Sequence, residues 1–167
     1  MTVIAYKDGV IAADSQETFG NRKIESEGKV FRVPTGPNKG HYICMSGESY
    51  VGQKLIEWYC DPTHKEKPVV ASDPADDESL LEFLVVKPDR SLHLMNESGL
   101  LVPIKSPKFY AIGCGGDIAM GALHCGKSPQ QAVVIACEYD AFCSKPVRVY
   151  HLPPLKPMKK KAAKTKR

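Results

Sequence analysis

The sequence has no long hydrophobic run, because none of its apolar stretches approaches the ~20 residues that a membrane-spanning helix needs. Its N-terminus also lacks the basic flank and long apolar segment that are typical of a secretory signal. These absences exclude a transmembrane protein and predict a cytoplasmic one. With 167 residues, of which 43% are apolar and 25% charged, the composition is that of a single globular domain.

The sequence also lacks closely spaced cysteine pairs, although it contains six cysteines. There is no C-x-x-C motif, and neither Cys60 with His64 nor His124 with Cys125 has a second pair at the spacing of a zinc site. A disulfide framework is typical of secreted chains, and no export signal supports that context. We therefore expect reduced thiols, no metal site and no cofactor.

Acidic residues are absent from the last twelve positions, where seven residues are basic. Because the net charge of the whole chain is +4, residues 1–155 carry −3. Several prolines and few apolar residues predict that residues 153–167 form a disordered basic tail after a folded domain over residues 1–152. The tail either increases solubility or contacts a polyanion such as nucleic acid. The basic residues are Lys156, Lys159, Lys160, Lys161, Lys164, Lys166 and Arg167.

What the sequence does contain is a hairpin pattern at its N-terminus, TVIAYKDGVIAAD over residues 2–14. Two apolar runs flank Asp8-Gly9, a dipeptide typical of two-residue hairpin turns. If Met1 is removed, Thr2 becomes a free N-terminal threonine, and the hairpin brings that end near Asp14. A hydroxyl, an amine and a carboxylate then lie together.

Groups of strands and helices follow this hairpin. Residues 15–27 are predicted to be a polar segment with a turn at Gly20-Asn21, and residues 61–79 a surface loop. The order of elements favours an α+β fold with mostly antiparallel sheets. Strand patterns occupy residues 29–33, 41–46, 80–87, 91–95, 99–104, 108–112 and 147–152, and helix patterns residues 48–60 and 117–125.

A third helix is predicted from its capping pattern. Ser128 is placed as the N-cap, Pro129 at the first helical position and Gln131 as the partner of a capping box. Ala132, Ile135 and Ala136 give this helix an apolar face.

A glycine-rich loop at residues 113–116 superficially has the form of a phosphate-binding loop between a strand and a helix. Ile118 stands where a dinucleotide fingerprint needs its third glycine, and no Lys-Ser/Thr pair follows. We therefore do not expect a nucleotide site.

Several segments together resemble the proteasome β-subunit and HslV family of N-terminal nucleophile hydrolases. The resemblance covers about 150 residues and implies a four-layer αββα sandwich that assembles into homo-oligomeric rings. The segments are YKDGVIAADS at residues 6–15, GN at 20–21, KVFRV at 29–33, SG at 46–47, YAIGCGG at 110–116 and DAFC at 140–143.

The resemblance implies that Thr2 is the nucleophile and supplies its own amine as the base. Lys29 matches the active-site lysine, Asp14 the orienting aspartate, and Gly47 the glycine whose backbone N–H helps to form the oxyanion hole. A free α-amino group, with an unperturbed pKa of ~7.7–8, is suited to take a proton near neutral pH. Without the resemblance, Lys29 and Asp14 would be interpreted as an ordinary ion pair at strand ends.

Three further positions match residues that support the nucleophile in the family. Asp140 matches the supporting aspartate, while Cys114 and Cys143 stand where the family has serine. A thiol is a much weaker hydrogen-bond partner than a hydroxyl. We therefore expect weaker proton-relay support for the nucleophile in this chain.

The hairpin is shorter than the resemblance implies, since Asp14 follows Thr2 by only twelve positions. Pairing the strands about Lys7-Asp8 places Ala13 opposite Thr2 and Met1 opposite Asp14. This register predicts that Thr2 is displaced along its strand by one two-residue step, roughly 6.6 Å at ~3.3 Å per residue. Such a displacement abolishes activity unless a bulge corrects it.

Three functions therefore stand as hypotheses. The first is a ring-forming threonine peptidase that cleaves peptides or unfolded proteins with Thr2, exposed by removal of Met1. The second is a non-catalytic, vestigial assembly protein, which the short hairpin and the missing serines favour. The third is an amidase that uses the same site on a small substrate. The sequence does not identify an ATPase partner.

Overall fold

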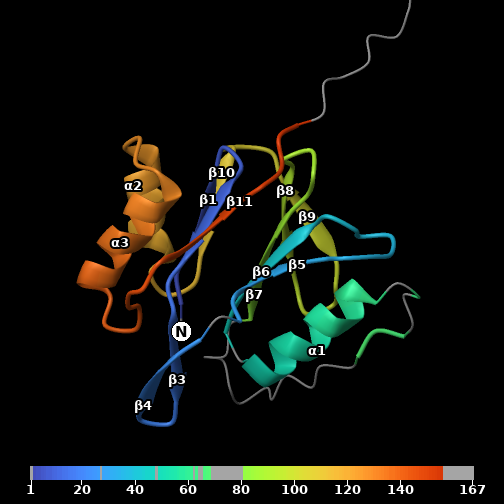
Figure 1. Cartoon of the computed structure of the whole chain (residues 1–167), viewed down its shortest axis with the longest axis horizontal. Coiled ribbons are helices and arrows are strands. Elements are labelled where there is room, and N and C mark those ends of the chain that lie inside the picture. Colours follow the sequence, from blue (N-terminus) through green and yellow to red (C-terminus); the bar gives the residue numbers. More distant parts are fainter. Residues whose placement is uncertain are drawn as a thin grey trace, which may run out of the picture.

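The computed structural model describes residues 2–26, 28–47, 49–61, 63, 66–68 and 81–155. In this part of the chain, two antiparallel sheets, a separate two-stranded hairpin and three helices form an α+β structure (Figure 1). The predicted fold class is confirmed. The predicted loop at 61–79 and the predicted tail lie mostly outside the described residues.

The first sheet has the strand order β10-β1-β2-β11, and the second has the order β5-β6-β7-β8-β9. Every neighbouring pair of strands is antiparallel. The first sheet contains β1 (Ile4–Lys7), β2 (Val10–Ala13), β10 (Phe109–Ile112) and β11 (Arg148–His151). The second contains β5 (Val30–Arg32), β6 (Tyr42–Ser46), β7 (Glu82–Val86), β8 (Leu92–Met95) and β9 (Leu101–Ile104).

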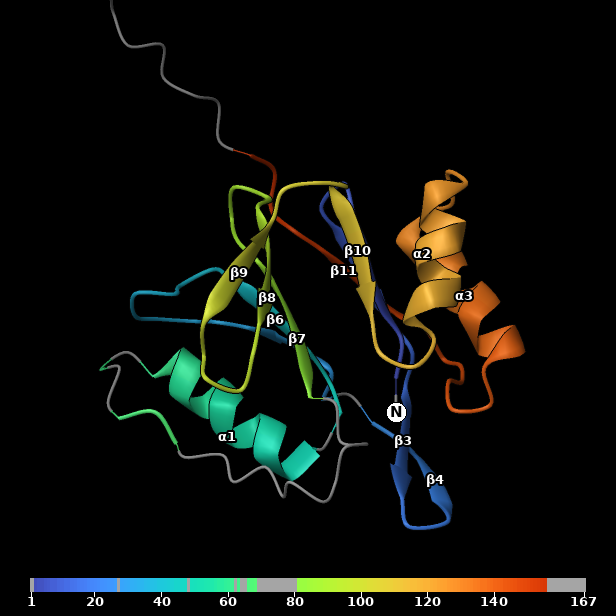
Figure 2. The same ribbon diagram turned by 180° about the vertical axis from the view of Figure 1, so that it is seen from behind.

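Helices cover the outer faces of both sheets, as Figures 1 and 2 show from opposite sides. Helices α2 (Gly116–His124) and α3 (Pro129–Tyr139) cover the first sheet, and α1 (Ser49–Cys60) covers the second. Three buried apolar clusters fill the spaces between these layers. The cluster between the sheets includes Ile4, Tyr6 and Leu84, all at most 1% exposed. The four-layer αββα arrangement is therefore present.

The capping pattern at the start of α3 is confirmed. Ser128 accepts a hydrogen bond from the Gln131 backbone, and the Gln131 side chain accepts one from the Ser128 backbone. The buried face of the helix holds Pro129, Ala132, Val133 and Ala136, whereas the predicted Ile135 is only half-buried. The reason is that the apolar residues 132–136 are nearly continuous, so their pattern alone does not fix the face.

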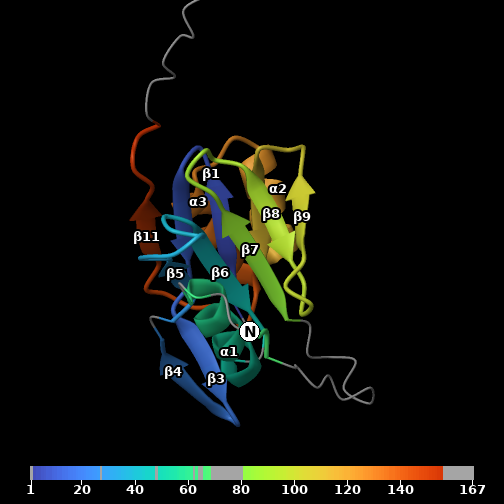
Figure 3. The same cartoon turned by 90° about the vertical axis from the view of Figure 1, so that its right-hand side faces the viewer.

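Residues 15–27 were predicted without strands, and this prediction is wrong. They contain β3 (Gln16–Phe19) and β4 (Arg22–Glu25), which pair around the predicted turn at Gly20-Asn21. The hairpin projects from the body below the two sheets (Figure 3). Its β4 strand is exposed along its whole length, so no buried face imposes the apolar alternation by which strands are predicted.

The N-terminal hairpin pairs Ile4 with Ala13 and Lys7 with Val10. Its turn is Asp8-Gly9, where φ is 50° and 83° respectively, as a two-residue turn with two left-handed residues requires. The predicted pairing about Lys7-Asp8 is wrong by two residues. The pairing continues as far as a hydrogen bond from Asp14 N to Val3 O of 3.1 Å, which brings Thr2 beside Asp14. The predicted displacement of Thr2 was based on that register and therefore loses its basis.

Within the described residues, no helix combines the length and the apolar character that crossing a bilayer requires.

Candidate active site

The buried polar side chains in the described part of the chain gather at one end of the two sheets. Six such residues are at most 7% exposed, although polar residues are mostly found at protein surfaces. They come from segments that lie far apart in the sequence, and most of them surround the first residue of the described chain. The six are Thr2, Asp14, Ser15, Gln16, Lys29 and Ser46.

Asp14 lies at the centre of this group, at the end of β2. Its Oδ1 accepts hydrogen bonds from Thr2 Oγ1 at 2.8 Å, from Val3 N at 2.9 Å and from Lys29 Nζ at 2.7 Å. The hydroxyl of Thr2 and the ammonium of Lys29 therefore meet on one carboxylate oxygen. Charge-assisted hydrogen bonds of this kind fix both partners more firmly than neutral ones.

The other carboxylate oxygen of Asp14 accepts two backbone N–H groups, from Gln16 at 3.0 Å and Ser144 at 3.2 Å. Lys29 has a second acceptor, the carbonyl oxygen of Gln16, at 2.5 Å. An ion pair removed from water is stable only when its remaining donors and acceptors are satisfied in this way. The Asp14–Lys29 pair, with both side chains at most 8% exposed, meets that condition.

Thr2 opens onto a small cavity of about 20 Å³, which is room for roughly one water molecule. Gly47, with φ of 112° where β6 turns toward α1, also lines this cavity. A hydrogen bond from Ser49 Oγ to Glu17 Oε1 spans two of its lining residues. This hydrogen bond is the main cause that lowers the pKa of Glu17. The other lining residues are Ser26, Gly28, Lys29, Met45 and Ser46.

Gly113 is a site residue that the sequence reasoning missed. Its φ is +91°, and a Cβ atom there would lie 2.2 Å from the Thr2 carbonyl oxygen and 2.9 Å from Ser46 Oγ. Only glycine permits so close an approach in this conformation. The signal was present in the glycine-rich loop, which was weighed as a phosphate site and matched within the YAIGCGG segment but was given no role at Gly113.

Cys114 and Cys143 lie on the other side of Thr2, on the loops that follow β10 and α3. The Cys114 thiol donates to the Thr2 carbonyl oxygen at 3.2 Å, and the two sulfur atoms are 3.6 Å apart. The hydrogen bond with Cys143 lowers the pKa of Cys114 to about 7, against the opposing effect of burial. The same hydrogen bond and burial raise the pKa of Cys143.

Asp140 completes this second group, since its carboxylate lies within 4.8 Å of both cysteine sulfurs. In the described chain, these are the residues whose ligand atoms are grouped closely enough to hold a metal ion. The sequence spacing gave no sign of the group, because it is assembled from two separate loops. Asp140 Oδ1 already accepts a hydrogen bond from Phe142 N at 2.7 Å.

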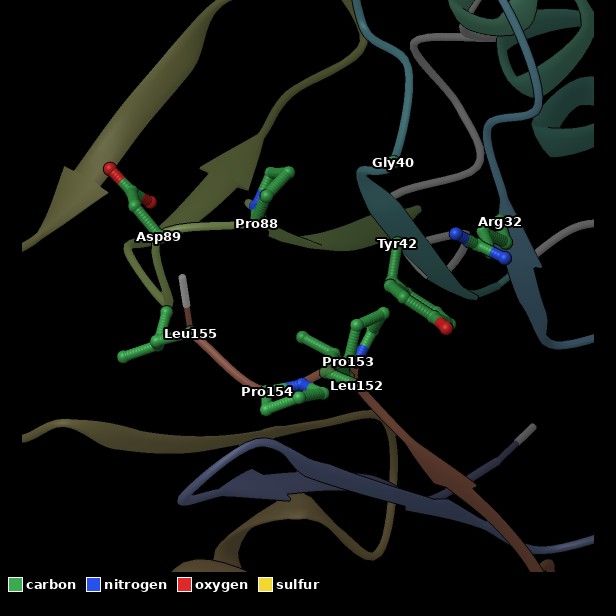
Figure 4. A pocket seen from close by; sticks show the side chains of 9 residues that line it. All are labelled: Arg32, Gly40, Tyr42, Pro88, Asp89, Leu152, Pro153, Pro154 and Leu155. Carbon is green, nitrogen blue, oxygen red and sulfur yellow. The ribbon is translucent and has the colours of Figure 1, made fainter. Parts of the chain in front are cut away.

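A much larger cavity, of about 600 Å³, lies at the opposite end of the sheets, where the chain leaves β11 (Figure 4). Its charged lining residues are Arg32 and Asp89, and most of the rest are prolines and apolar side chains. None of the predicted site residues lines it. Cavity volume alone would therefore place the site away from the buried polar residues. We instead assign the candidate site to the residues around Thr2, because they are the ones with catalytic chemistry.

The predicted site residues thus form two groups that meet at Thr2. Thr2, Asp14 and Lys29 are joined directly by hydrogen bonds, and Gly47 lines the same cavity as Thr2. Asp140, Cys114 and Cys143 form the second group, which is connected to Thr2 through its carbonyl oxygen rather than its hydroxyl.

No family model and no curated protein matches this sequence. Among solved structures, BPH from Thiobacillus denitrificans, a bacterial proteasome homologue, has 21% identity and a TM-score of 0.62, covering 92% of this chain and 98% of that chain. The same protein in complex with Epoxomicin has 21% identity and a TM-score of 0.60, covering 92% and 99%.

Eukaryotic HslV from Trypanosoma brucei is also similar, with 18% identity and a TM-score of 0.59 over 89% of this chain and 97% of that chain. At these identities the likeness is one of fold. It confirms the fold that the sequence resemblance implied, and it extends over nearly the whole length of each neighbour.

Proposed function

We propose that this chain is a divergent proteasome/HslV-like threonine peptidase that hydrolyses peptide bonds with Thr2. The observation that supports this most strongly is the meeting of Thr2 Oγ1 and Lys29 Nζ on one oxygen of a buried carboxylate. An ordinary surface ion pair has no need of a third, hydroxyl partner or of such complete burial. The shared fold of the neighbours is consistent with this assignment.

The proposed reaction begins after removal of Met1, which makes the Thr2 nitrogen a free amine. This amine takes the hydroxyl proton while Thr2 Oγ1 attacks the scissile carbonyl carbon and forms an acyl-enzyme. The protonated amine then gives its proton to the leaving nitrogen. Attack by a water molecule releases the second product and restores the hydroxyl.

Asp14 and Lys29 act in this proposal as the groups that orient Thr2 and stabilise charge. The Lys29 cation lies on the same carboxylate oxygen as the hydroxyl, so it favours the developing alkoxide and the neutral form of the amine. The Gly47 backbone N–H is proposed as an oxyanion donor, and such donors contribute ~3–4 kcal/mol to transition-state stability.

Assembly into a homo-oligomeric ring in the cytoplasm is part of the same proposal, with peptides or unfolded proteins as substrates. Two large aromatic side chains, Phe19 and Tyr139, are 80% and 78% exposed, so a neighbouring subunit could bury them. Light scattering should give a mass several times the chain mass of 18.4 kDa. A monomer at micromolar concentration contradicts the ring.

A non-catalytic assembly protein is the second candidate, and one observation favours it. Thr2 is only 2% exposed, and the cavity beside it has room for about one water molecule. A peptidase of this geometry must widen this space to admit a substrate. An assembly protein needs no such opening.

Peptide hydrolysis by three variants separates the two candidates. Thr2→Ala and Lys29→Met should each lower kcat/KM by at least ~100-fold, since each removes a group that acts in the transition state. Lys54→Met, an exposed lysine on α1, is the matched control and should leave the rate unchanged. A wild-type chain that has lost Met1 and yet hydrolyses no peptide favours the assembly protein.

A further inference from the structure

Two cysteines from separate loops are in contact beside Thr2. Cys114 lies between β10 and α2, and Cys143 lies between α3 and β11, 29 positions later in the chain. Their sulfur atoms are 3.6 Å apart, and a disulfide requires about 2.05 Å. The two sulfur atoms must therefore approach by about 1.5 Å to form the bond.

The surrounding backbone holds the Cys143 sulfur close to Cys114. Gly115 has no side chain, and a Cβ atom there would lie 3.1 Å from Cys143 Sγ. Cys143 N donates to the Asp140 carbonyl oxygen at 3.3 Å, which fixes the turn that carries the cysteine. A side chain at position 115 would therefore displace the Cys143 sulfur from this place.

The two thiols differ in the way that a reactive and a resolving cysteine must differ. Cys114 is exposed, whereas Cys143 is only 3% exposed. The lowered pKa of Cys114, about 7, gives a substantial thiolate fraction at neutral pH. An oxidant in solution therefore meets Cys114 first, and Cys143 lies within reach of any product formed there.

We propose that Cys114 and Cys143 form a reversible oxidation site that reacts with hydroperoxides and closes to a disulfide. The Cys114 thiolate attacks the peroxide O–O bond, giving a sulfenic acid and releasing hydroxide from hydrogen peroxide. The Cys143 sulfur then displaces the sulfenic hydroxyl, and the S–S bond forms as water leaves. In total, two thiols lose two electrons and two protons, and one hydrogen peroxide becomes two waters.

The presence of cysteine at both positions, rather than at one, supports this proposal. The sequence resemblance implies serine at both positions, and a single cysteine there would be exposed to irreversible over-oxidation. Two cysteines in contact instead make the first oxidation product reversible.

Closure of the disulfide changes the surroundings of Thr2. Neither sulfur then carries a proton, so the hydrogen bond that the protonated Cys114 thiol donates to the Thr2 carbonyl oxygen is lost. Of the two hydrogen bonds to this oxygen, the longer one, from Gly115 N–H at 3.4 Å, remains. The effect on activity rests on the proposed function. We expect oxidation to lower kcat/KM by about threefold to tenfold, which corresponds to the net contribution of one hydrogen bond. Dithiothreitol should restore the rate.

The test treats the full chain with one equivalent of hydrogen peroxide, blocks free thiols with N-ethylmaleimide, and maps the peptides by mass spectrometry without reduction. The expected product is a linked pair of peptides that contain Cys114 and Cys143, with a loss of two hydrogens. Cys143→Ser should give sulfenic or higher oxidation at Cys114 and no link. Cys125→Ser, the removal of another exposed thiol, should leave the link unchanged.

Three outcomes overturn the proposal. The first is that both thiols remain free while another cysteine is oxidised, and the second is that Cys114 links to a different cysteine. The third is a zinc ion retained by Cys114, Asp140 and Cys143 that prevents the disulfide from forming. Peptide mapping requires no enzymatic activity. A lack of peptidase activity would therefore contradict the proposed function but would not affect the test of the disulfide.

Discussion

Thr2 lies between two polar clusters that differ in almost every physical property. The carboxylate cluster consists of Asp14, Lys29 and the backbone N–H groups that bind Asp14, and its side chains are almost completely buried. The thiol cluster consists of Cys114, Cys143 and Asp140, and it is partly exposed and held by weak sulfur contacts.

The two clusters act on different parts of Thr2: the carboxylate cluster positions its hydroxyl, and the thiol cluster contacts its carbonyl oxygen. Five donors satisfy the Asp14 carboxylate, so the position of the Thr2 hydroxyl is determined by strong, short hydrogen bonds. The thiol cluster contacts only the Thr2 carbonyl oxygen, through a weak S–H donor. Damage to the carboxylate cluster should therefore affect both folding and activity, whereas changes in the thiol cluster should modulate activity.

The largest expected effect is that of Asp14→Asn. This substitution leaves the buried Lys29 cation without its counter-charge, and breaking a buried pair by removing one partner costs ~3–5 kcal/mol. The free energy of unfolding from urea titration should fall by about that amount, and peptidase activity should be lost.

Glu138→Gln is the matched control for this substitution. It removes one partner of the exposed Glu138–Lys145 pair, whose N–O distance is 3.8 Å. An exposed pair contributes ~0–1 kcal/mol, so the urea midpoint should hardly move. Equal losses in the two variants would contradict the distinction between a buried and an exposed pair.

Gly113→Ala should have the next largest effect. The new methyl group would collide with the Thr2 carbonyl oxygen, and the left-handed backbone adds strain of ~1–3 kcal/mol. Because an error of ~1 Å in position costs ~100-fold in rate, kcat/KM should fall by about that factor. Gly121→Ala, in α2 where the added methyl group would meet nothing outside its own helix backbone within 4 Å, should leave the rate unchanged and slightly raise stability.

Cys114→Ser tests the thiol cluster by strengthening it. A hydroxyl donates a stronger hydrogen bond to the Thr2 carbonyl oxygen than a thiol does, at nearly the same geometry. We expect kcat/KM to rise by about twofold to tenfold, with little change in the free energy of unfolding. A large loss of stability in this variant would mean that the two clusters do not differ as described.

The smallest effect is a pH dependence confined to the thiol cluster. Since the pKa of Cys114 is lowered to about 7, its alkylation by iodoacetamide should become faster as pH rises through 7 and level off above it. In urea, the inflection should move up to the ordinary thiol value of ~8.5. Mass spectrometry of the peptide that contains Cys114 measures both profiles, and an inflection near 8.5 in the folded chain would contradict the pKa shift.

The elements of the fold could be predicted from the sequence because most of them bury one face. The strands of both sheets and the α3 capping box each have a local pattern that the structure retains. The β3–β4 hairpin could not be predicted in this way, because it projects into solvent and buries little. Its residues carry no period that distinguishes a strand from a polar loop.

The candidate site could be predicted as a set of residues but not as a geometry. Strand register depends on the turn. The predicted pairing was centred on Lys7-Asp8, whereas the structure centres it on Asp8-Gly9, and this difference shifts the residue opposite Thr2 by two positions. Gly113 was missed because its role depends on the Thr2 carbonyl oxygen, which is far away in the sequence. Contact between Cys114 and Cys143 likewise depends on two loops that only the fold brings together.

The proposed peptidase function depends above all on whether Thr2 becomes a reactive N-terminal residue. The purified chain is incubated with Epoxomicin, the compound found in complex with a protein of the same fold, and its intact mass and peptide map are recorded. We expect a mass without Met1 and an Epoxomicin adduct on Thr2 that is absent from Lys29→Met. A mature chain that keeps Met1, or an unmodified Thr2, would contradict this function.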